Sequence, residues 1–493
     1  MYKKFGGYIF SLLTSSLICI TLFSYAEETK SGIKITLQEC ISLALKSNLN
    51  IRIQRISPQI QDTLLTMAEG RFDPSATFVP NVRNSEEPGI TKADVRNSNS
   101  QGFTLGITDP IVMGGSYGLS FNSNRSESNQ TLNPTYRSGL TFNVNQPLLE
   151  GFGIGFNKAS ITIAKNNKEI SLLRLKAQLI KTLSEVQNAY WELVFAIENL
   201  KVQRLALKQA QELLKKNQRF KEVGKATESD ILQAQSAVAS RKADVIAAED
   251  AVKDAEDKLK RVTNMIQDAT KWDMPIVPLD APSFEEMEVS LEEGLATALK
   301  NRPEYAQAKI DLENSNISIK VAKNQRLPRL DLEGSLSLNG LGNELGEPFS
   351  QVGKADYDTW SVGLFLRVPL NGRWTKAELE KSRLEKEQAL LSLKDLEQQI
   401  INDVRGAVRQ LETDKKRIDA TKAAEEFARQ ALSTEERKHE LGITTSYELL
   451  QFQANSATAT KNRLRAVIDY RKSIVALYQA LGVTLEKLNI ELE

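Results

Sequence analysis

The sequence has 493 residues, with 64 basic side chains, 63 acidic side chains and a single histidine. This balance excludes an overall charge attraction to nucleic acid or to an anionic membrane surface. One histidine nearly excludes histidine-based catalytic triads and multi-histidine metal sites, and we identify no catalytic, cofactor-binding or metal-binding group of residues. We therefore do not expect an enzyme.

The first 26 residues predict a signal peptide for export. Lys3 and Lys4 form a positive start, residues 8–23 are mostly apolar, and residues 24–26 offer small side chains for cleavage. A membrane anchor is the alternative, but the apolar stretch is short and contains hydroxyl residues. No later run reaches about 18 apolar residues, so we expect no transmembrane helix. After cleavage Cys40 is the only cysteine, and we expect it to be buried rather than reactive.

The chain repeats parts of its own sequence. The matching pairs are residues 36–46 with 290–300, Pro74 with Pro328, and residues 224–235 with 442–453. Duplication on this scale predicts two similar halves packed side by side, because neither half is expected to bury its faces alone. We place the first repeat at residues 27–274, a linker at residues 275–288, and the second repeat at residues 289–493.

Alternating apolar and polar residues predict β-strands in each repeat, at about residues 75–147 and about 329–370. The first region offers about four alternating segments and the second offers two. Such alternation suits a membrane strand between lipid and water, and it also suits a soluble sheet with one buried face. The signal peptide and the adjoining helices favour membrane strands. The exposed loops would be residues 84–101, 124–136 and 339–358.

Two long tracts without proline, residues 148–274 and 370–493, permit very long helices, because an interior proline costs about 3 kcal/mol. Apolar residues spaced by three and four predict coiled-coil-like packing of these helices. Gly406 interrupts one of them and suggests a site of close contact. The predicted helical hairpins span about residues 158–265, turning at Gly224, and about residues 374–481, turning at Gly442.

Several short segments occur in the order typical of one known family. They are residues 37–45 with their repeat 291–299, residues 146–153 and 368–372 where strand passes into helix, and the two glycine-containing turns. With these segments the chain resembles the TolC-like outer-membrane efflux and secretion channels over nearly all of the mature sequence. The resemblance implies a mainly α fold with membrane β, in which a coiled-coil-like α-helical barrel continues a shared transmembrane β-barrel. It also implies a homotrimer with, usually, four strands per protomer. The longer strand region here leaves two alternatives, a barrel with more strands or one hairpin outside the membrane.

The function implied by the resemblance is a passive channel in the outer membrane, with its helical part in the periplasm. It would be the exit duct of a tripartite efflux pump or of a type I secretion system. Its partners would be a periplasmic adaptor protein and an inner-membrane pump, and it would need no cofactor. The alternative is a periplasmic adaptor or another coiled-coil interaction protein. Such a protein would share the signal peptide and the long helices but would lack amphipathic strands that end in loops.

The resemblance also implies an adaptor-docking surface and a gate at the two helix turns. The docking turns are Gly224, Lys225, Ala226, Thr227, Gly442, Ile443, Thr444 and Thr445. The gate candidates are Asp230, His439, Thr444, Glu448 and Gln451. Family members tie an aspartate to a tyrosine and an arginine, whereas this chain keeps Asp230 but has His439 and Thr444 at the other two positions. Of two lumen-facing acidic residues in the family, Glu448 matches one, and Gln451 stands at the other.

Three of the gate candidates also have a purely structural interpretation. Asp230 could complete a helix N-terminus that is capped by Thr227 or Ser229. Glu448, in the first turn of a helix, is favoured by the helix dipole whatever it faces. His439 is either an exposed residue at a helix end or a group whose protonation, near a pKa of about 6.5, changes closure of the tip.

Overall fold

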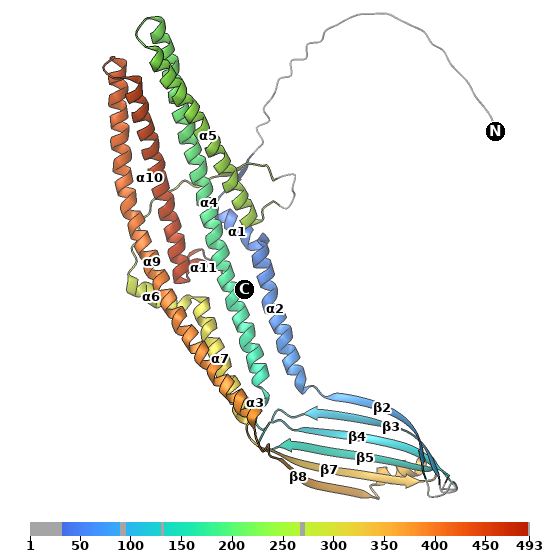
Figure 1. Cartoon of the computed structure of the whole chain (residues 1–493). Coiled ribbons are helices and arrows are strands. Elements are labelled where there is room, and N and C mark those ends of the chain that lie inside the picture. The colour runs from blue at the N-terminus through green and yellow to red at the C-terminus, as the bar shows by residue number, and fades with distance from the viewer. Residues whose placement is uncertain (1–31, 89–94, 130–132, 267–271, 492–493) are drawn as a thin grey trace, which may run out of the picture.

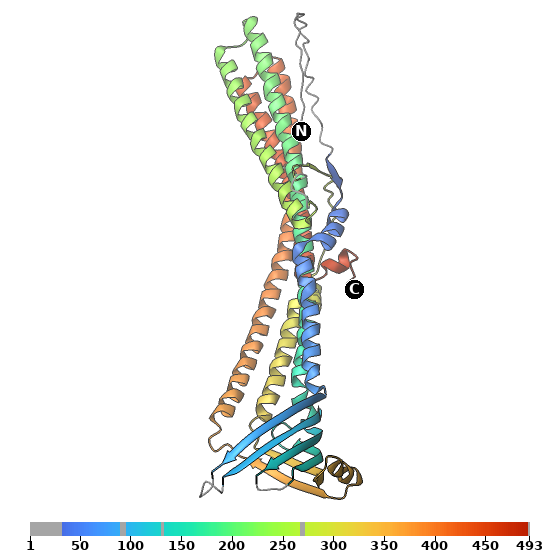
Figure 2. The same ribbon diagram turned by 90° about the vertical axis from the view of Figure 1, so that its right-hand side faces the viewer.

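The computed structural model of the chain describes residues 32–88, 95–129, 133–266 and 272–491. The predicted signal peptide lies outside these residues. Figure 1 shows a bundle of very long helices that ends in a single β-sheet, and Figure 2 shows that the molecule is thin when it is viewed from the side. This mainly helical architecture with strands at one end confirms the predicted fold class.

The first half of the chain carries four strands of the sheet between its helices. Its elements are β1 (Ile33–Ile35), α1 (Leu37–Ser47), α2 (Leu49–Glu69), the 3-10 helix η1 (Gly70–Phe72), β2 (Ser75–Glu87), β3 (Arg96–Pro110), β4 (Ser116–Ser128), β5 (Thr135–Pro147), α3 (Ile154–Asn157), α4 (Ala159–Glu222) and α5 (Glu228–Thr263). Helix α4 has 64 residues and therefore spans about 95 Å at ~1.5 Å per residue.

The second half follows the same order with two strands. Its elements are β6 (Ile276–Pro278), α6 (Leu291–Asn301), α7 (Pro303–Asn324), β7 (Arg329–Gly342), α8 (Gly346–Lys354), β8 (Asp358–Arg367), α9 (Arg373–Glu440), α10 (Ser446–Leu481) and α11 (Thr484–Lys487). Helices α1 and α6 both have 11 residues, and Pro74 and Pro328 each directly precede a strand. None of the helices in the described ranges combines the length and the apolar character needed to cross a membrane.

The sheet is antiparallel, with the strand order β2-β3-β4-β5-β7-β8. Two adjacent rows of paired residues differ in character, because successive side chains on a strand point to opposite faces. One row is Ala76, Ile107, Leu119, Phe142, Leu336 and Trp360. The next row, on the opposite face, is Thr77, Gly106, Ser120, Thr141, Ser337 and Thr359. We call these two surfaces the apolar face and the polar face of the sheet.

Three of the loops predicted from sequence are shorter than expected. Strands β2, β3, β4, β5 and β7 all extend into them, and the segment predicted as a loop at residues 339–358 contains helix α8. Pro348 and Val352 of this helix are buried, and a side chain at Gly340 would place its Cβ 2.2 Å from the Pro348 carbonyl oxygen. The helix therefore packs against the sheet where small strand residues allow a close approach, although its own glycines and proline are typical of a loop.

The core lies near the middle of the helical part. One apolar cluster joins α4 to α1 and α5, and a second joins α9 to α6 and α10. Cys40 is fully buried in the first cluster, as expected, and burial raises the pKa of its thiol to about 12. The thiol is thus protonated and inert at neutral pH. Within one protomer Gly406 makes no such close contact, because a Cβ there would meet no atom of the described residues within 4 Å outside the backbone of its own helix.

Candidate functional site

The two helical hairpins turn at the end of the molecule farthest from the sheet (Figure 1). Both turns use a glycine with positive φ, Gly224 at 72° and Gly442 at 74°. Each is closed by a backbone hydrogen bond after the glycine, from Lys225 N to Phe220 O (2.8 Å) and from Ile443 N to Lys438 O (2.9 Å). Glycine suits this conformation because a side chain would strain it. The two tips are therefore built in the same way.

The helix that follows each turn begins with a capping box. The Asp230 carboxylate accepts hydrogen bonds from Thr227 N (2.9 Å) and Thr227 Oγ1 (2.7 Å), while the Thr227 hydroxyl caps Asp230 N (3.2 Å). Glu448 and Thr445 repeat this arrangement in the second hairpin. Hydrogen bonds from Thr227 lower the pKa of Asp230, and those from Thr444 and Thr445 lower the pKa of Glu448. Within one protomer, Asp230 and Glu448 therefore both act as capping residues at a helix N-terminus.

A buried polar group, which we call the tip cluster, joins both hairpins: Asn217 of α4, His439 of α9 and Ser446 of α10. The Asn217 amide donates to Ser446 Oγ (3.0 Å) and to the carbonyl oxygen of Asp230 (3.2 Å). His439 Nε2 lies 3.4 Å from the same Ser446 hydroxyl. All three side chains are buried. Because buried polar groups are costly when unpaired, this cluster stabilises the contact between the two hairpins.

His439 is buried rather than exposed, so its interpretation as an exposed helix-end residue is wrong. Burial lowers the pKa of the imidazole, and the positive charge of Lys216 lowers it further. Asp230, Glu435 and Glu440 act in the opposite direction without overcoming this effect. The imidazole is therefore neutral at pH 7, and its Nδ1 has no hydrogen-bond partner among the described residues.

Thr444 contributes to a second polar contact at the same turn. Its hydroxyl lies within hydrogen-bonding reach of the Glu435 and Glu448 carboxylates and donates its one proton to one of them at a time. Glu435 is buried and also pairs with Lys438 Nζ (3.3 Å). Thr444 thereby links the last turn of α9 to the first turn of α10.

The structure brings some of the predicted gate residues together and separates others. His439, Thr444 and Glu448 share the second turn, and Asp230 reaches them through its backbone carbonyl and Asn217. Gln451 instead contacts Asn455 (3.2 Å) on its own helix. Sequence analysis missed Asn217 and Ser446. The available signal for Asn217 was its place four residues after the buried Leu213, where an apolar residue would be expected.

The tips also expose apolar side chains to solvent. Leu441 and Ile443 at the second turn are 74% and 71% exposed, Tyr447 is exposed on the helix that follows, and Val223 is exposed at the first turn. Isolated apolar residues are common on surfaces, but both turns carry them. The tips therefore offer an apolar contact surface.

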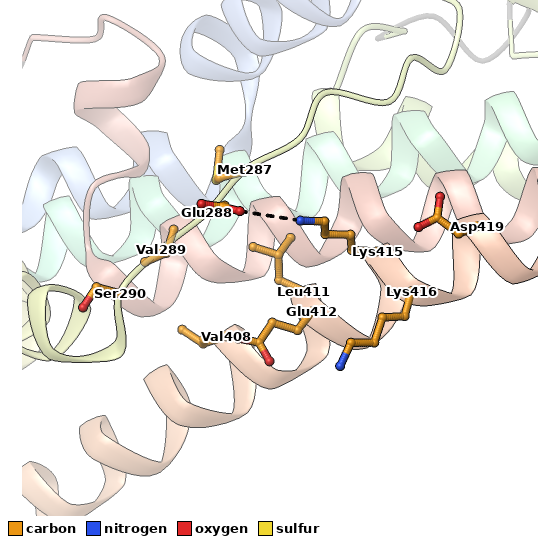
Figure 3. Close-up of a pocket in the computed structure, with 10 residues that line it drawn as sticks. All are labelled: Met287, Glu288, Val289, Ser290, Val408, Leu411, Glu412, Lys415, Lys416 and Asp419. Atoms are coloured by element: carbon orange, nitrogen blue, oxygen red, sulfur yellow. Dashed lines mark ion pairs between the residues drawn. The ribbon is translucent and has the colours of Figure 1, made fainter.

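A hollow lies between the segment before α6 and helix α9, and charged side chains line it (Figure 3). Lys415 points toward Glu288 at 3.8 Å and also pairs with Glu286. The other lining groups include Glu412, Lys416 and Asp419. These are surface charges, of which Lys415 is ion-paired, and no nucleophile lies beside a base among the lining residues. Across the described ranges, no three His, Cys, Asp or Glu side chains are grouped to hold a metal ion.

Comparison with known proteins gives matches along most of the chain. The family described as outer membrane efflux protein matches residues 116–265 and 294–483. Outer membrane protein TolC of Vibrio cholerae is 26% identical over 307 residues, which cover 61% of this chain and 68% of that protein. Pyoverdine export outer membrane protein OpmQ of Pseudomonas putida is 24% identical over 422 residues, which cover 81% of this chain and 83% of that protein. The crystal structure of the Campylobacter jejuni CmeC outer membrane channel has a TM-score of 0.68 at 18% identity and covers 97% of this chain and 94% of that chain, which shows a shared fold.

Proposed function

The chain belongs to the outer membrane efflux protein family, and on this premise we propose that three copies assemble into one continuous duct that is gated at the helix tips. The protein lies in the outer membrane with its helical part in the periplasm, and it is the exit duct of an efflux or type I secretion system. It is not an enzyme. It works with adaptor and inner-membrane partners, and its location excludes the alternative of a periplasmic adaptor.

One observation carries the proposed trimer: the sheet of a single protomer is open. Within the described residues, β2 and β8 each pair on one side only, and all ten residues of β8 are exposed. The apolar face leaves Trp360 and Val362 70% and 69% exposed. Unpaired backbone groups are too costly in lipid, so a membrane sheet must close on itself. Three copies, the number that the family resemblance implies, would close it.

Two structural repeats, residues 27–274 and 289–493 with a linker at 275–288, suit this assembly. Helices at corresponding positions support the division, since α1 and α6 both have 11 residues and α5 and α10 both have 36. The two hairpin turns also use the same glycine conformation. In the trimer, the repeated helical hairpins would pack side by side around the duct. The apolar tip residues would then be available to contact the adaptor. The docking surface would comprise the turns at Gly224–Thr227 and Gly442–Thr445 with their exposed neighbours.

The proposed trimer is tested by purification in detergent and reconstitution in a planar bilayer. We expect a native mass three times that of the mature chain and discrete, ohmic channel currents. Both results follow from closure of three open sheets into one duct. A monomeric product that conducts no ions would contradict the proposal.

We expect the gate to respond to pH through His439. Because the folded tip lowers the pKa of this imidazole below its usual value of about 6.5, the packed tip binds fewer protons than the loosened one. The contribution of neutral His439 to the stability of the packed tip is therefore complete above about pH 6.5 and decreases as the pH falls below that value. We expect the mean bilayer current to rise between pH 7.5 and pH 5.5 as the two hairpins separate.

The matched variant is His439→Gln, which keeps a polar side chain near Ser446 but does not titrate in this range. Its current is expected to be independent of pH between 5.5 and 7.5. Asp230, Glu435, Glu440 and Lys216 face His439 and remain in the variant. An identical pH response of the two channels would show that His439 is not the sensor.

A further inference from the structure

The sheet has six strands, and the two repeats contribute to it unequally. Strands β2 and β7 both follow the repeated proline, at Pro74 and Pro328, while β5 and β8 both lead into a long helix. By this correspondence the hairpin β3–β4 has no counterpart in the second repeat. This hairpin is either part of the wall of the membrane β-barrel or an extra hairpin outside the barrel.

Backbone pairing places the hairpin β3–β4 inside the wall. Strand β3 pairs with β2 from Thr108 opposite Ser75 to Arg96 opposite Glu87, and β4 pairs with β5 along most of its length. The apolar row Ala76, Ile107, Leu119 and Phe142 and the polar row Thr77, Gly106, Ser120 and Thr141 both pass through β3 and β4. An extra hairpin outside the barrel would break these rows, whereas a wall strand must continue them.

The turn of this hairpin is also built into the junction between sheet and helices. Ile111 N donates to Gly115 O (2.7 Å), and Gly153 N donates to Met113 O (3.0 Å). A Cβ at Gly114 would lie 2.1 Å from the Gly151 carbonyl oxygen, so only glycine permits this approach. The hairpin is therefore held at the start of the helical part, level with the other strand ends.

The two free edges are compatible with each other in direction. Strand β2 leaves the helical part after η1, and β8 returns to it before α9. An even number of strands places these edges antiparallel, so β8 of one copy can pair with β2 of the next in the same pattern as the rest of the sheet.

The edges are also staggered as a tilted barrel requires. Thr359 of β8 shares a row with Thr77 of β2, yet β2 continues from that row to Glu87 while β8 continues in the opposite direction to Arg367. Figure 2 shows the strands inclined to the long axis of the helices. When tilted strands close a barrel, the register must advance around the ring. This stagger brings the middle of β8 level with the middle of the neighbouring copy's β2.

From this arrangement we infer that β2 and β8 form the interface between copies and that the assembled barrel has eighteen strands, three copies of six. The inference rests on the proposed trimer. Barrel diameter grows roughly in proportion to strand number, so this barrel is about 1.5 times as wide as one with four strands per copy. Barrels of about 16 to 18 strands hold an open aqueous channel. The narrowest part of the duct is then at the helix tips, and the sheet does not restrict the cargo.

Disulfide cross-linking between copies tests the inference. In a Cys40→Ala background, one cysteine replaces Val79, Asn81 or Arg83 of β2 and a second replaces Ser361, Gly363 or Phe365 of β8. All six positions belong to the polar face, and their combinations span the stagger. In the matched control set, cysteines at Ser120, Asn122 or Asn124 of β4 replace those of β2. Mild oxidation is followed by denaturing electrophoresis, with the native mass measured beforehand.

We expect at least one β2–β8 combination to convert the native trimer into a covalent ring of three, and no β4–β8 combination to do so. Cross-linking from β4 to β8 would overturn the inference, because β4 would then be an edge and the hairpin β2–β3 would lie outside the barrel. If the hairpin β3–β4 lay outside instead, β2 would have to pair with β5, which the observed pairing of β2 with β3 and of β4 with β5 contradicts. A native trimer in which no β2–β8 combination links would overturn it as well. A monomeric protein would instead refute the proposed trimer itself.

Discussion

Replacing Val362 by arginine is expected to destabilise the membrane-inserted protein by about 2 to 4 kcal/mol, the cost of a lipid-facing arginine near the middle of the bilayer. Val362 lies near the middle of β8 on the apolar face and is 69% exposed in the protomer. In the proposed trimer this face would contact lipid, so the guanidinium would lose its hydration. The free energy of unfolding from lipid vesicles, measured by urea titration, provides the test.

Ser361→Arg is the matched control, because the neighbouring residue on the same strand points to the polar face. Its side chain would enter the aqueous lumen and should change the stability by less than about 1 kcal/mol. Equal destabilisation by both substitutions would mean that lipid does not contact the apolar face. A smaller effect at Val362 than at Ser361 would mean that the sheet is assembled with its faces reversed.

Replacing Tyr190 by alanine is expected to destabilise the helical part by about 3 to 5 kcal/mol, the range for removing a large buried aromatic side chain. Tyr190 is fully buried in the cluster around α4 and packs edge-on against Trp191. Its hydroxyl donates to Asp280 (2.6 Å), which also accepts from Leu37 N (2.7 Å). The side chain therefore joins α4 to the linker and to the start of α1. Chemical denaturation in detergent, followed by the helical circular dichroism signal, measures the loss.

Two further variants separate the contributions of Tyr190. Tyr190→Phe keeps the ring and removes the hydroxyl, so we expect a loss of about 1 to 3 kcal/mol, because the Asp280 carboxylate loses one of its donors and the Asp280 N–H loses its acceptor. Leu205→Ala, at an exposed position of the same helix, should cost no more than about 0.5 kcal/mol. A cost for Tyr190→Ala as small as that for Leu205→Ala would show that the linker and α1 do not depend on this contact.

The tips illustrate how far sequence reasoning can reach. Gly224 is predicted as a turn because it is the only glycine between Phe156 and Pro275, and Gly442 because its segment repeats that of Gly224. A threonine followed three residues later by Asp230 or Glu448 forms a capping box in both hairpins. These features are local, so a single stretch of chain specifies them. His439 and Asn217 are more than 200 residues apart in the chain, yet both contact the Ser446 hydroxyl, and no local pattern contains that arrangement.

The long helices, the alternating strands and the duplicated arrangement could all be predicted from sequence, because proline spacing, period-two alternation and repetition act over short segments. The folded chain was needed to show that six strands form one sheet, that α8 lies on that sheet, and that the tip histidine is buried. Strand order and helix seating depend on backbone pairing and packing between distant segments. The energies of pairing and packing arise only when distant segments come together, so no single segment of the sequence reveals them.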